Sequence, residues 1–220
     1  MSRCELRVIR TVDVCFAIFG LIFLLPIFIV VACVLAVSGE REVFYLQERV
    51  GANYRSFRII KFATMLKRSM EMAGGAVTLE NDPRVTKIGR FLRATKINEL
   101  PQLLNVLFGD MSLIGPRPLV ESSFASYSSE AQDLIVSVRP GISSLNAIYF
   151  KSEEKLVGAD VDEYFKTILP AKEQLEVYLV EHFSFKLYCS TLIGTLLAIF
   201  SPKCADYLRD SIESKILNGG

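Results

Sequence analysis

Residues that build metal centres and disulfide frameworks are scarce in this sequence. It contains one histidine, His182, and five cysteines, none of which forms a Cys-x-x-Cys pair. Cys15 and Cys33 lie inside the longest apolar run, so neither a zinc site nor a disulfide framework is supported. Unpaired cysteines are typical of a reducing compartment, which points to the cytoplasm. His182 has no ligand partner at suitable spacing, and we expect it to be structural or exposed.

An excess of charge of either sign is also lacking. The 220 residues carry 25 Lys and Arg and 24 Asp and Glu, a net charge of +1, which predicts no nucleic-acid partner. The sequence contains no internal repeat and no low-complexity tract. Its length suits one domain, or one domain with an anchor, and is sufficient for a buried core.

Hydrophobic residues are concentrated near the N-terminus, in an uncharged run over residues 14–37 that reads VCFAIFGLIFLLPIFIVVACVLAV. A helix of this length can cross a hydrocarbon core of about 30 Å. Pro26 lies at its middle, where it removes the hydrogen bond to the carbonyl of Ile22 and disfavours helical geometry at Leu25, at a cost of about 3 kcal/mol. We therefore expect a kink or a turn near Pro26.

Basic residues flank the apolar run on both sides. They are Arg3, Arg7 and Arg10 before it, and Arg41, Arg49, Arg55, Arg58, Lys61, Lys67 and Arg68 after it. Because positive charge favours the cytoplasmic side, this pattern favours a re-entrant helix with both ends inside the cell over a kinked single span. A helix-break-helix can satisfy the carbonyl freed by the proline locally. We divide the chain into an anchor over residues 1–38 and a cytoplasmic domain over residues 39–220.

The remainder predicts an α+β fold that is mainly helical. Two β-prone runs, 43–47 and 56–62, predict a small hairpin around the turn-like residues ERVGANYR. Helical periodicity covers 122–136 and 161–180, with Pro170 expected to divide the second stretch. Residues 67–78 contain Gly74 and Gly75 and predict a surface loop. The apolar stretch 187–200 is too short to span a membrane, which leaves a core helix and an interfacial helix as alternatives.

The segment KINELPQLLNVLFGDMSLIGPRPL, residues 96–119, has the features of a helix start followed by a rigid turn. Pro101 is tolerated only in a first turn, so we expect Asn98 as N-cap, Glu99 in the first turn and an end at Gly109. Glu99 then lies at the positive end of a helix dipole. Such a position suits an anion, or a carboxylate that shares a divalent cation with phosphates.

Arg117 lies between two prolines, whose fixed torsions limit the directions open to its guanidinium. Arginine binds phosphate through two parallel hydrogen bonds. Further basic residues are expected around the same helix start, at Lys61, Arg84, Arg93 and Arg139. They exceed the nearby acids Asp82, Glu99 and Asp110, and beside a membrane anchor they indicate a diphosphate substrate.

Three stretches resemble the bacterial sugar transferase family, the small monotopic phosphoglycosyl transferases. They are FRIIKFATM at 57–65, NDPRVTKIGRFLRATKINELPQLLNVLFGDMSLIGPRPL at 81–119 and VRPGIS at 138–143. The resemblance covers nearly the whole chain, from the anchor with its central proline to the C-terminal helices. The run LPQLLNVLFGDMSLIGPRP is long enough to make chance agreement negligible.

The resemblance implies an activity at the cytoplasmic face of the bacterial inner membrane. Members of the family transfer a sugar 1-phosphate from a nucleotide diphospho-sugar, usually a UDP-sugar, to polyprenyl phosphate. The products, a polyprenyl diphospho-sugar and UMP, start the synthesis of a lipopolysaccharide, capsule or exopolysaccharide. Mg²⁺ assists the transfer, and a re-entrant helix in contact with membrane lipid keeps the site at the surface.

The resemblance also assigns roles to individual residues. Members carry an Asp-Glu pair before Leu-Pro-Gln, the Asp as nucleophile and the Glu near the metal, and here the pair is Asn98-Glu99. Basic positions that contact phosphates or support the site are matched by Lys61, Arg93, Arg117 and Arg139. The chain departs from the family pattern at Leu25, at Ala63 and in ISSLNAIYF after Gly141.

The missing aspartate leaves the reaction route open, because an amide is a poor nucleophile toward phosphorus. Glu99 itself can attack; polyprenyl phosphate can attack directly with Mg²⁺ neutralising charge; or the chain is inactive. The last case corresponds to a second function, a catalytically impaired membrane-anchored adaptor with the same fold. The oligomeric state is also open, and a homodimer is one of its alternatives.

Overall fold

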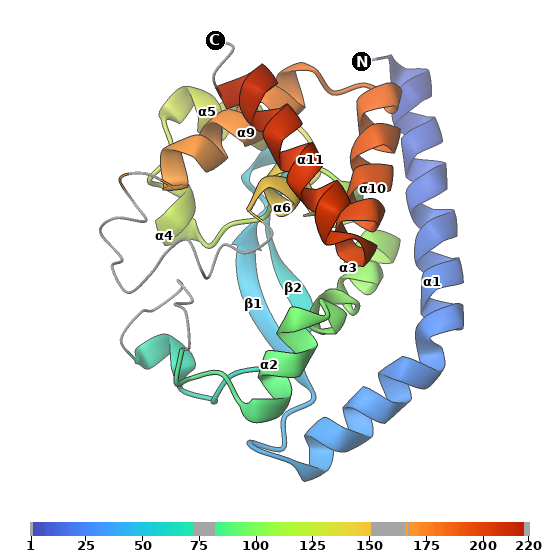
Figure 1. Cartoon of the computed structure of the whole chain (residues 1–220), viewed down its shortest axis with the longest axis vertical. Helices are drawn as coiled ribbons and strands as arrows, with labels where there is room; N and C mark the ends of the chain where they lie inside the picture. The colour runs from blue at the N-terminus through green and yellow to red at the C-terminus, as the bar shows by residue number, and fades with distance from the viewer. Residues whose placement is uncertain (1, 73–81, 151–165, 167, 218–220) are drawn as a thin grey trace.

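A computed structural model describes residues 2–72, 82–150, 166 and 168–217. It confirms the expected α+β class, because two small sheets lie among many helices (Figure 1). The helices are α1 Arg3–Val37, α2 Lys87–Ala94, α3 Gln102–Phe108, α4 Glu121–Phe124, α5 Ser129–Ile135, α6 Leu145–Tyr149, α9 Leu169–Glu181, α10 Phe185–Phe200 and α11 Pro202–Ile212. The strands are β1 Phe44–Val50, β2 Ser56–Phe62, β3 Ser112–Ile114 and β4 Gly141–Ser143.

The N-terminal helix α1 is longer than the apolar run alone predicts. It begins at Arg3 because Ser2 and Glu5 form a capping box, in which each side chain accepts a hydrogen bond from the backbone N–H of the other. The helix continues through Pro26, and Figure 1 shows that its course bends so that its second half passes beneath the domain. It is long and apolar enough to cross a membrane. A break near Pro26 and a re-entrant path stay predictions.

One face of α1 packs against the rest of the chain near both ends of the helix. Ile9 and Ala17 join a core cluster with residues of α3, β3 and α10, and Leu35 packs with Phe62 and Leu92. The opposite face carries large apolar side chains that are exposed, among them Phe16, Phe19, Ile22, Phe23, Ile29 and Val30. An exposed apolar surface of this size is typical of contact with a partner or a membrane.

The hairpin of β1 and β2 confirms the expected strand pair. The two strands are antiparallel, in a register that runs from Phe44 opposite Phe62 to Val50 opposite Ser56. Side chains alternate between the two faces of a strand, so Tyr45 and Arg49 share a face, and Lys61, which pairs with Tyr45, shares it too. The hairpin therefore presents two basic residues on one side.

The parallel pair of β3 and β4 brings the Gly-Pro-Arg-Pro turn against Arg139-Pro140-Gly141. Ser112 pairs with Gly141 and Ile114 with Ser143. The two backbones approach so closely that a Cβ on Gly115 would lie 2.3 Å from the carbonyl oxygen of Arg139. Glycine is required there for space, since no side chain fits between the strands.

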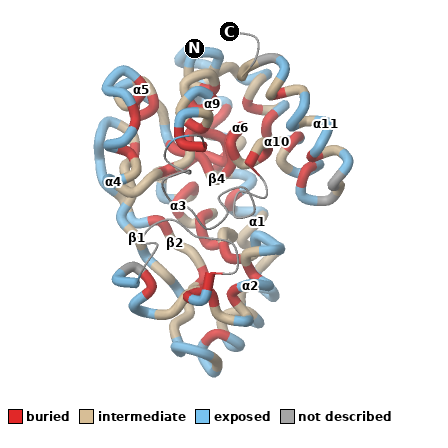
Figure 2. The backbone as a smooth tube through the Cα atoms, turned by 60° about the vertical axis from the view of Figure 1, so that its left-hand side comes forward, coloured by how far each residue is buried: buried red, intermediate tan, exposed pale blue. Residues whose placement is uncertain are grey.

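The C-terminal half packs α5, α6, α9 and parts of α10 and α11 into a second core, and Figure 2 shows buried segments gathered around α6, α9 and α10. In α10, Tyr188 and Ala198 are buried, whereas Ile193 and Leu197 are exposed. The helix thus has the buried face expected of a core helix and an apolar outer face. Contact of that outer face with a membrane interface stays a prediction.

One helix prediction is wrong in this half. The single helix expected over 122–136 is divided, because Ser128 caps α5 by accepting a hydrogen bond from the N–H of Ala131 at 3.3 Å. Pro170 lies in the first turn of α9, where its missing N–H needs no acceptor. That it divides the stretch 161–180 stays a prediction, because residues 161–165 and 167 lie outside the described residues. Of the surface loop expected over 67–78, the half over residues 73–78 also lies outside the described residues.

A buried aspartate ties α1 to the domain. Asp13 is 1% exposed, although it lies directly before the apolar run. Its Oδ1 accepts hydrogen bonds from the backbone N–H of Leu113 at 2.9 Å and from the hydroxyl of Tyr188 at 2.8 Å. A single carboxylate oxygen thereby connects α1, β3 and α10.

We expect Asp13→Leu to destabilise the fold more than Asp13→Asn. Leucine leaves a buried N–H and a buried hydroxyl without an acceptor, at about 1–3 kcal/mol for each donor. Asparagine keeps an oxygen at the same place and is expected to unfold close to wild type. Thermal unfolding of the detergent-solubilised chain measures the difference. Equal midpoints for the two variants would show that the hydrogen bonds do not hold α1 in place.

Candidate active site

Glu99 shares one carboxylate oxygen between two basic residues. It ends the short 3₁₀ helix η3, Ile97–Glu99, and its side chain is 14% exposed. Oε1 lies 3.3 Å from Nζ of Lys61 on β2 and 3.0 Å from Nη2 of Arg117, which follows β3. The fold thus joins three segments that are far apart in the sequence at one acidic side chain.

The charges of this group shift the pKa values of its members. Burial alone would raise the pKa of Glu99, but the positive charges of Arg117, Lys61 and Lys96 outweigh it and hold that pKa well below its usual range. Burial lowers the pKa of Lys61 to about 8, although the charge of Glu99 acts in the opposite direction. At neutral pH the carboxylate is therefore ionised and the lysine is mostly charged.

Arg49 is a member of this group that the sequence analysis did not identify. It lies on β1, where Nη1 donates to the carbonyl of Pro118 at 3.2 Å and Nη2 donates to Oε1 of Gln47 at 2.5 Å. Its Nε is buried and has no partner among the described residues. Burial, together with the nearby charge of Arg117, lowers the pKa of Arg49 to about 10. The sequence signal for Arg49 is the alternation of side chains between the two faces of β1, which places Arg49 on the same face of the hairpin as Lys61.

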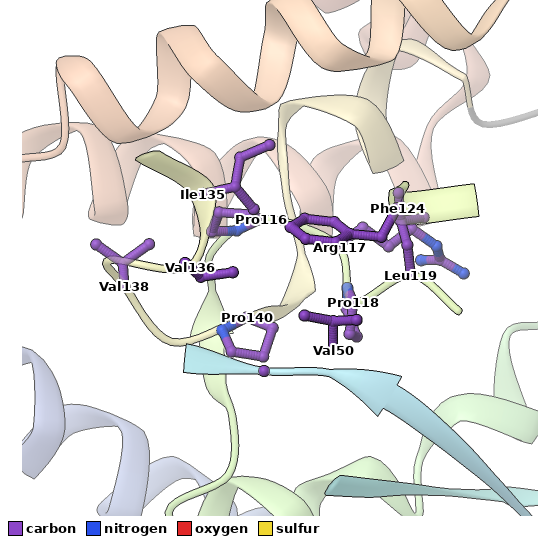
Figure 3. Close-up of a pocket in the computed structure, with 11 residues that line it drawn as sticks. Val50, Pro116, Arg117, Pro118, Leu119, Phe124, Ile135, Val136, Val138 and Pro140 are labelled. Carbon is purple, nitrogen blue, oxygen red and sulfur yellow. The ribbon is translucent and has the colours of Figure 1, made fainter. Parts of the chain in front are cut away.

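The turn that carries Arg117 rests on a small apolar pocket. Figure 3 shows Pro116, Pro118 and Pro140 around the pocket, with the guanidinium of Arg117 pointing away from its centre. Its lining includes Val50, Leu119, Phe124, Ile135 and Val136. The free volume of about 10 Å³ is close to that of one water molecule, so this pocket supports the turn and has no room for a substrate.

Asn98 is next to Glu99 but is not the N-cap that the sequence predicts. It lies inside η3, which is held by hydrogen bonds from Glu99 N to Lys96 O and from Leu100 N to Ile97 O, each 3.1 Å. Pro101 occupies the N-cap position of α3, and the prediction that this helix ends at Gly109 is confirmed. Asn98 is buried, and its Oδ1 accepts no hydrogen bond within the described part of the chain. A buried acceptor of this kind is available to a ligand.

The structure does not bring every predicted basic residue to Glu99. Arg84 is buried against Asp82, where Nη2 and Oδ2 lie 2.6 Å apart, and its Nη1 donates to the carbonyl of Ser69 at 2.9 Å. These contacts explain why Arg84 holds its own segment together and is not directed at Glu99. Its expected role in phosphate binding has no support from this geometry.

Arg139 and Arg93 also lie outside the group that contacts Glu99. Arg139 is exposed and donates from Nε to the carbonyl of Gly109 at 3.0 Å, at the far end of α3. Arg93 lies in the last turn of α2, which packs against η3. Among the described residues, the partners of Glu99 are Lys61 and Arg117.

A metal ion would find only part of its ligands here. The described residues contain no cluster of three or more His, Cys, Asp or Glu side chains that could hold a metal ion. Both ion pairs of Glu99 use Oε1, and the buried Oδ1 of Asn98 is the neighbouring oxygen without a partner. These oxygens fit Mg²⁺ as part of a site that substrate phosphates and water complete, which is how Mg²⁺ commonly binds.

Comparison with known proteins relates the whole arrangement to one family. The exopolysaccharide production protein ExoY of Sinorhizobium fredii is 37% identical over 150 residues, which cover 62% of this chain and 66% of that protein. The UDP-galactose-lipid carrier transferase of Erwinia amylovora is 35% identical over 150 residues, 62% of this chain and 31% of its own.

A third relative is the UDP-N-acetylgalactosamine-undecaprenyl-phosphate N-acetylgalactosaminephosphotransferase of Aeromonas hydrophila. It is 38% identical over 136 residues, 61% of this chain and 32% of its own. The chain thus spans less than two thirds of the length of each of these relatives. The profile of the family described as "Bacterial sugar transferase" matches residues 4–202, which include α1 and all the residues around Glu99. The chain therefore belongs to the bacterial sugar transferase family.

Proposed function

We propose that this chain transfers a sugar 1-phosphate from a nucleotide diphospho-sugar, with UDP as the nucleotide, to polyprenyl phosphate. The observation that carries the proposal is the ionised carboxylate of Glu99, held by Lys61 and Arg117 with the half-buried Arg49 nearby. Phosphoryl transfer needs charge neutralisation and positioning more than any other contribution from a protein. The three basic side chains can neutralise a diphosphate, and the relatives from Erwinia amylovora and Aeromonas hydrophila are named for a UDP-sugar and for a lipid carrier or undecaprenyl phosphate.

Two chemical routes are compatible with this arrangement. In the first, an oxygen of Glu99 attacks the phosphorus that bears the sugar, the bond to UMP breaks, and UMP leaves with the bonding electrons. An oxygen of polyprenyl phosphate then attacks the same phosphorus and frees the carboxylate. In the second, polyprenyl phosphate attacks directly and Glu99 acts as an electrostatic and structural group. In both routes the low pKa of Glu99 keeps it ionised without a separate base.

Mg²⁺ belongs to the proposal as a cofactor that completes the neutralisation of the diphosphate. Glu99 and the Oδ1 of Asn98 are the residues that would hold it. Lys61 and Arg117 orient the carboxylate on its other oxygen, because both contact Oε1. These residues bind and orient in either route.

The proposed location is the cytoplasmic face of the inner membrane, with the chain monotopic. Long exposed apolar side chains on α1 support membrane contact. Ile9 and Ala17 pack on the domain near one end of the helix, and Leu35 packs on it near the other. A helix whose two ends are packed on one domain favours re-entry over a full span, because a span requires about 20 residues within the hydrocarbon.

A catalytically impaired adaptor is the competing function, because Asn98 stands where the family has its nucleophilic Asp. The position of Glu99 argues against it. A buried carboxylate with two basic partners is costly to desolvate and adds little to stability, so the set is better explained by a charged substrate than by scaffolding. Release of UMP from UDP-sugars, measured with polyprenyl phosphate present, separates the two functions.

The first prediction concerns the pair Asn98-Glu99. If Glu99 is the nucleophile, Glu99→Gln abolishes UMP release with and without acceptor, and mass spectrometry detects a phospho-sugar adduct on the wild type. If attack is direct, the wild type releases UMP only when polyprenyl phosphate is present, and no adduct forms. Full activity of Glu99→Gln would contradict both routes.

The matched variant is Asn98→Asp, which restores the family's carboxylate. Asp and Asn have similar size and hydrogen-bonding geometry, so we expect little change in the unfolding midpoint. Any change in turnover is then chemical, and the appearance of an adduct only in this variant would assign the wild type to the direct route. A large loss of folding in Asn98→Asp would show instead that the buried site does not accept a second carboxylate.

The second prediction concerns pH. Because the pKa of Lys61 is lowered to about 8, its positive charge persists below that value and is lost above it. The affinity for UDP should therefore fall by roughly fivefold between about pH 8 and about pH 9. Lys61→Arg stays charged and should keep its affinity for UDP in that range. The variant therefore serves as the control for any change in the protonation of UDP itself. Parallel curves for the two proteins in calorimetric titrations would contradict this role.

The third prediction concerns membrane topology. Cys4 is exposed at the start of α1, and Ser56 is exposed at the start of β2. In a background without other cysteines, an impermeant maleimide should label Cys4 and the Ser56→Cys variant from the cytoplasmic side only. Pro26→Leu removes the constraint on the helix and should shift Cys4 toward the outer side. Opposite labelling of the two positions in the unmodified background would rule out re-entry.

A further inference from the structure

The turn Gly115-Pro116-Arg117-Pro118 has only two backbone N–H groups, because proline has none. The N–H of Gly115 donates to the carbonyl of Ser143 at 3.1 Å, which extends the pairing of β3 with β4. The N–H of Arg117 donates to a side chain, the Oε1 of Glu176, at 3.1 Å. The residue whose guanidinium contacts Glu99 therefore has its backbone held by a second carboxylate.

Glu176 comes from the middle of α9 and is 2% exposed. Its Oε1 also accepts hydrogen bonds from Oγ of Ser144 at 3.2 Å and from Nδ2 of Asn146 at 2.6 Å. Its Oε2 is buried and has no hydrogen-bond partner within the described residues. One oxygen thus joins the arginine turn to the segment after β4, within the stretch ISSLNAIYF that departs from the family pattern.

The other side of the turn is held as well. Nη1 of Arg49 donates to the carbonyl of Pro118 at 3.2 Å, and the N–H of Gly141 donates to the carbonyl of Pro116 at 2.9 Å. The carbonyls on either side of Arg117 are therefore both engaged. With its N–H bound to Glu176, the backbone of Arg117 has little freedom, and the direction of its side chain is set by these contacts.

A carboxylate that is buried at this place carries a cost. Burial raises the pKa of Glu176 to about 7, which reflects a penalty for the charged form that three hydrogen-bond donors do not cancel. An apolar side chain of the same size would avoid that penalty. It would also leave three donors, the N–H of Arg117, the hydroxyl of Ser144 and the amide of Asn146, without this acceptor.

We propose that Glu176 is a positioning residue for phosphoryl transfer: by fixing the backbone N–H of Arg117, it directs the guanidinium toward Glu99 and the substrate phosphates. Glu176 itself touches neither. The reaction it serves rests on the proposed function, but its structural action can be measured without any substrate. Displacement of a positioned group by about 1 Å can lower a rate by roughly 100-fold.

Hydrogen–deuterium exchange of the full detergent-solubilised chain tests the structural action. In a peptide that covers the turn, the two prolines contribute no amide, so the signal of Arg117 is simple to isolate. We expect a protected amide in the wild type, loss of that protection in Glu176→Met, and retention in Glu176→Gln, which keeps an acceptor oxygen. Rapid exchange at Arg117 in the wild type, or unchanged protection in Glu176→Met, would overturn the proposal. The wild-type measurement decides even where the methionine variant does not fold.

A double-mutant cycle tests the effect on the reaction. We expect Glu176→Met to lower kcat/KM for the sugar donor by roughly 10-fold to 100-fold, and Glu176→Gln by less than roughly threefold. In an Arg117→Met background, Glu176→Met should have almost no further effect, because the group it positions is gone. Independent, additive losses would show that Glu176 only stabilises the fold. If the wild type releases no UMP, the proposed function fails, while the exchange result still decides whether Glu176 holds the turn.

Discussion

The ion pairs of Glu99 are the interaction on which the arrangement of this site depends. One oxygen of this nearly buried carboxylate receives Lys61 from the hairpin and Arg117 from the turn after β3. Removal of either partner leaves this nearly buried charge with a single basic contact, which costs more than the net worth of the lost pair. The charge is maintained because the basic residues around Glu99 overcome the effect of burial on its pKa. A site that is charged before substrate arrives is preorganised for the diphosphate that we propose as its substrate.

The segments around this ion pair are connected to the helix that carries the apolar surface. Arg10 of α1 donates from Nη1 and Nη2 to the carbonyls of Val106 and Leu107, at 2.7 Å and 3.2 Å, near the end of α3. Glu99 precedes the other end of α3. Together with Asp13, these contacts hold α1 against the same elements that position the acidic side chain. A displacement of α1 would therefore be transmitted to Glu99 through the short helix α3.

Local patterns predicted some residues of the site and missed others for a common reason. Lys61, Glu99 and Arg117 stand in distinctive local sequence, and the structure brings them together. Arg84 and Arg139 were expected beside them, but Asp82 and the carbonyl of Gly109 are their partners. Arg49 was missed because the run around it was taken as a turn, although it lies on β1 and the alternation of that strand places it on the face of Lys61. Glu176 was missed because nothing in the helix around it indicates its partner. A charged residue acquires its role from the group that faces it, and that group is often distant in sequence.

The sequence by itself determined the apolar N-terminal helix, the hairpin, the helix end at Gly109 and the family. These depend on hydrophobic periodicity, turn residues and a long motif, all of which are local. Only the tertiary structure decided that Asn98 lies inside a 3₁₀ turn, that α1 packs along the domain, and that Arg117 is held between Glu176 and Arg49. The 3₁₀ turn is local, but the contacts of α1 and of Arg117 each close a loop of many residues. The free energy that selects them is the burial and pairing of polar groups from different segments, which no local pattern specifies.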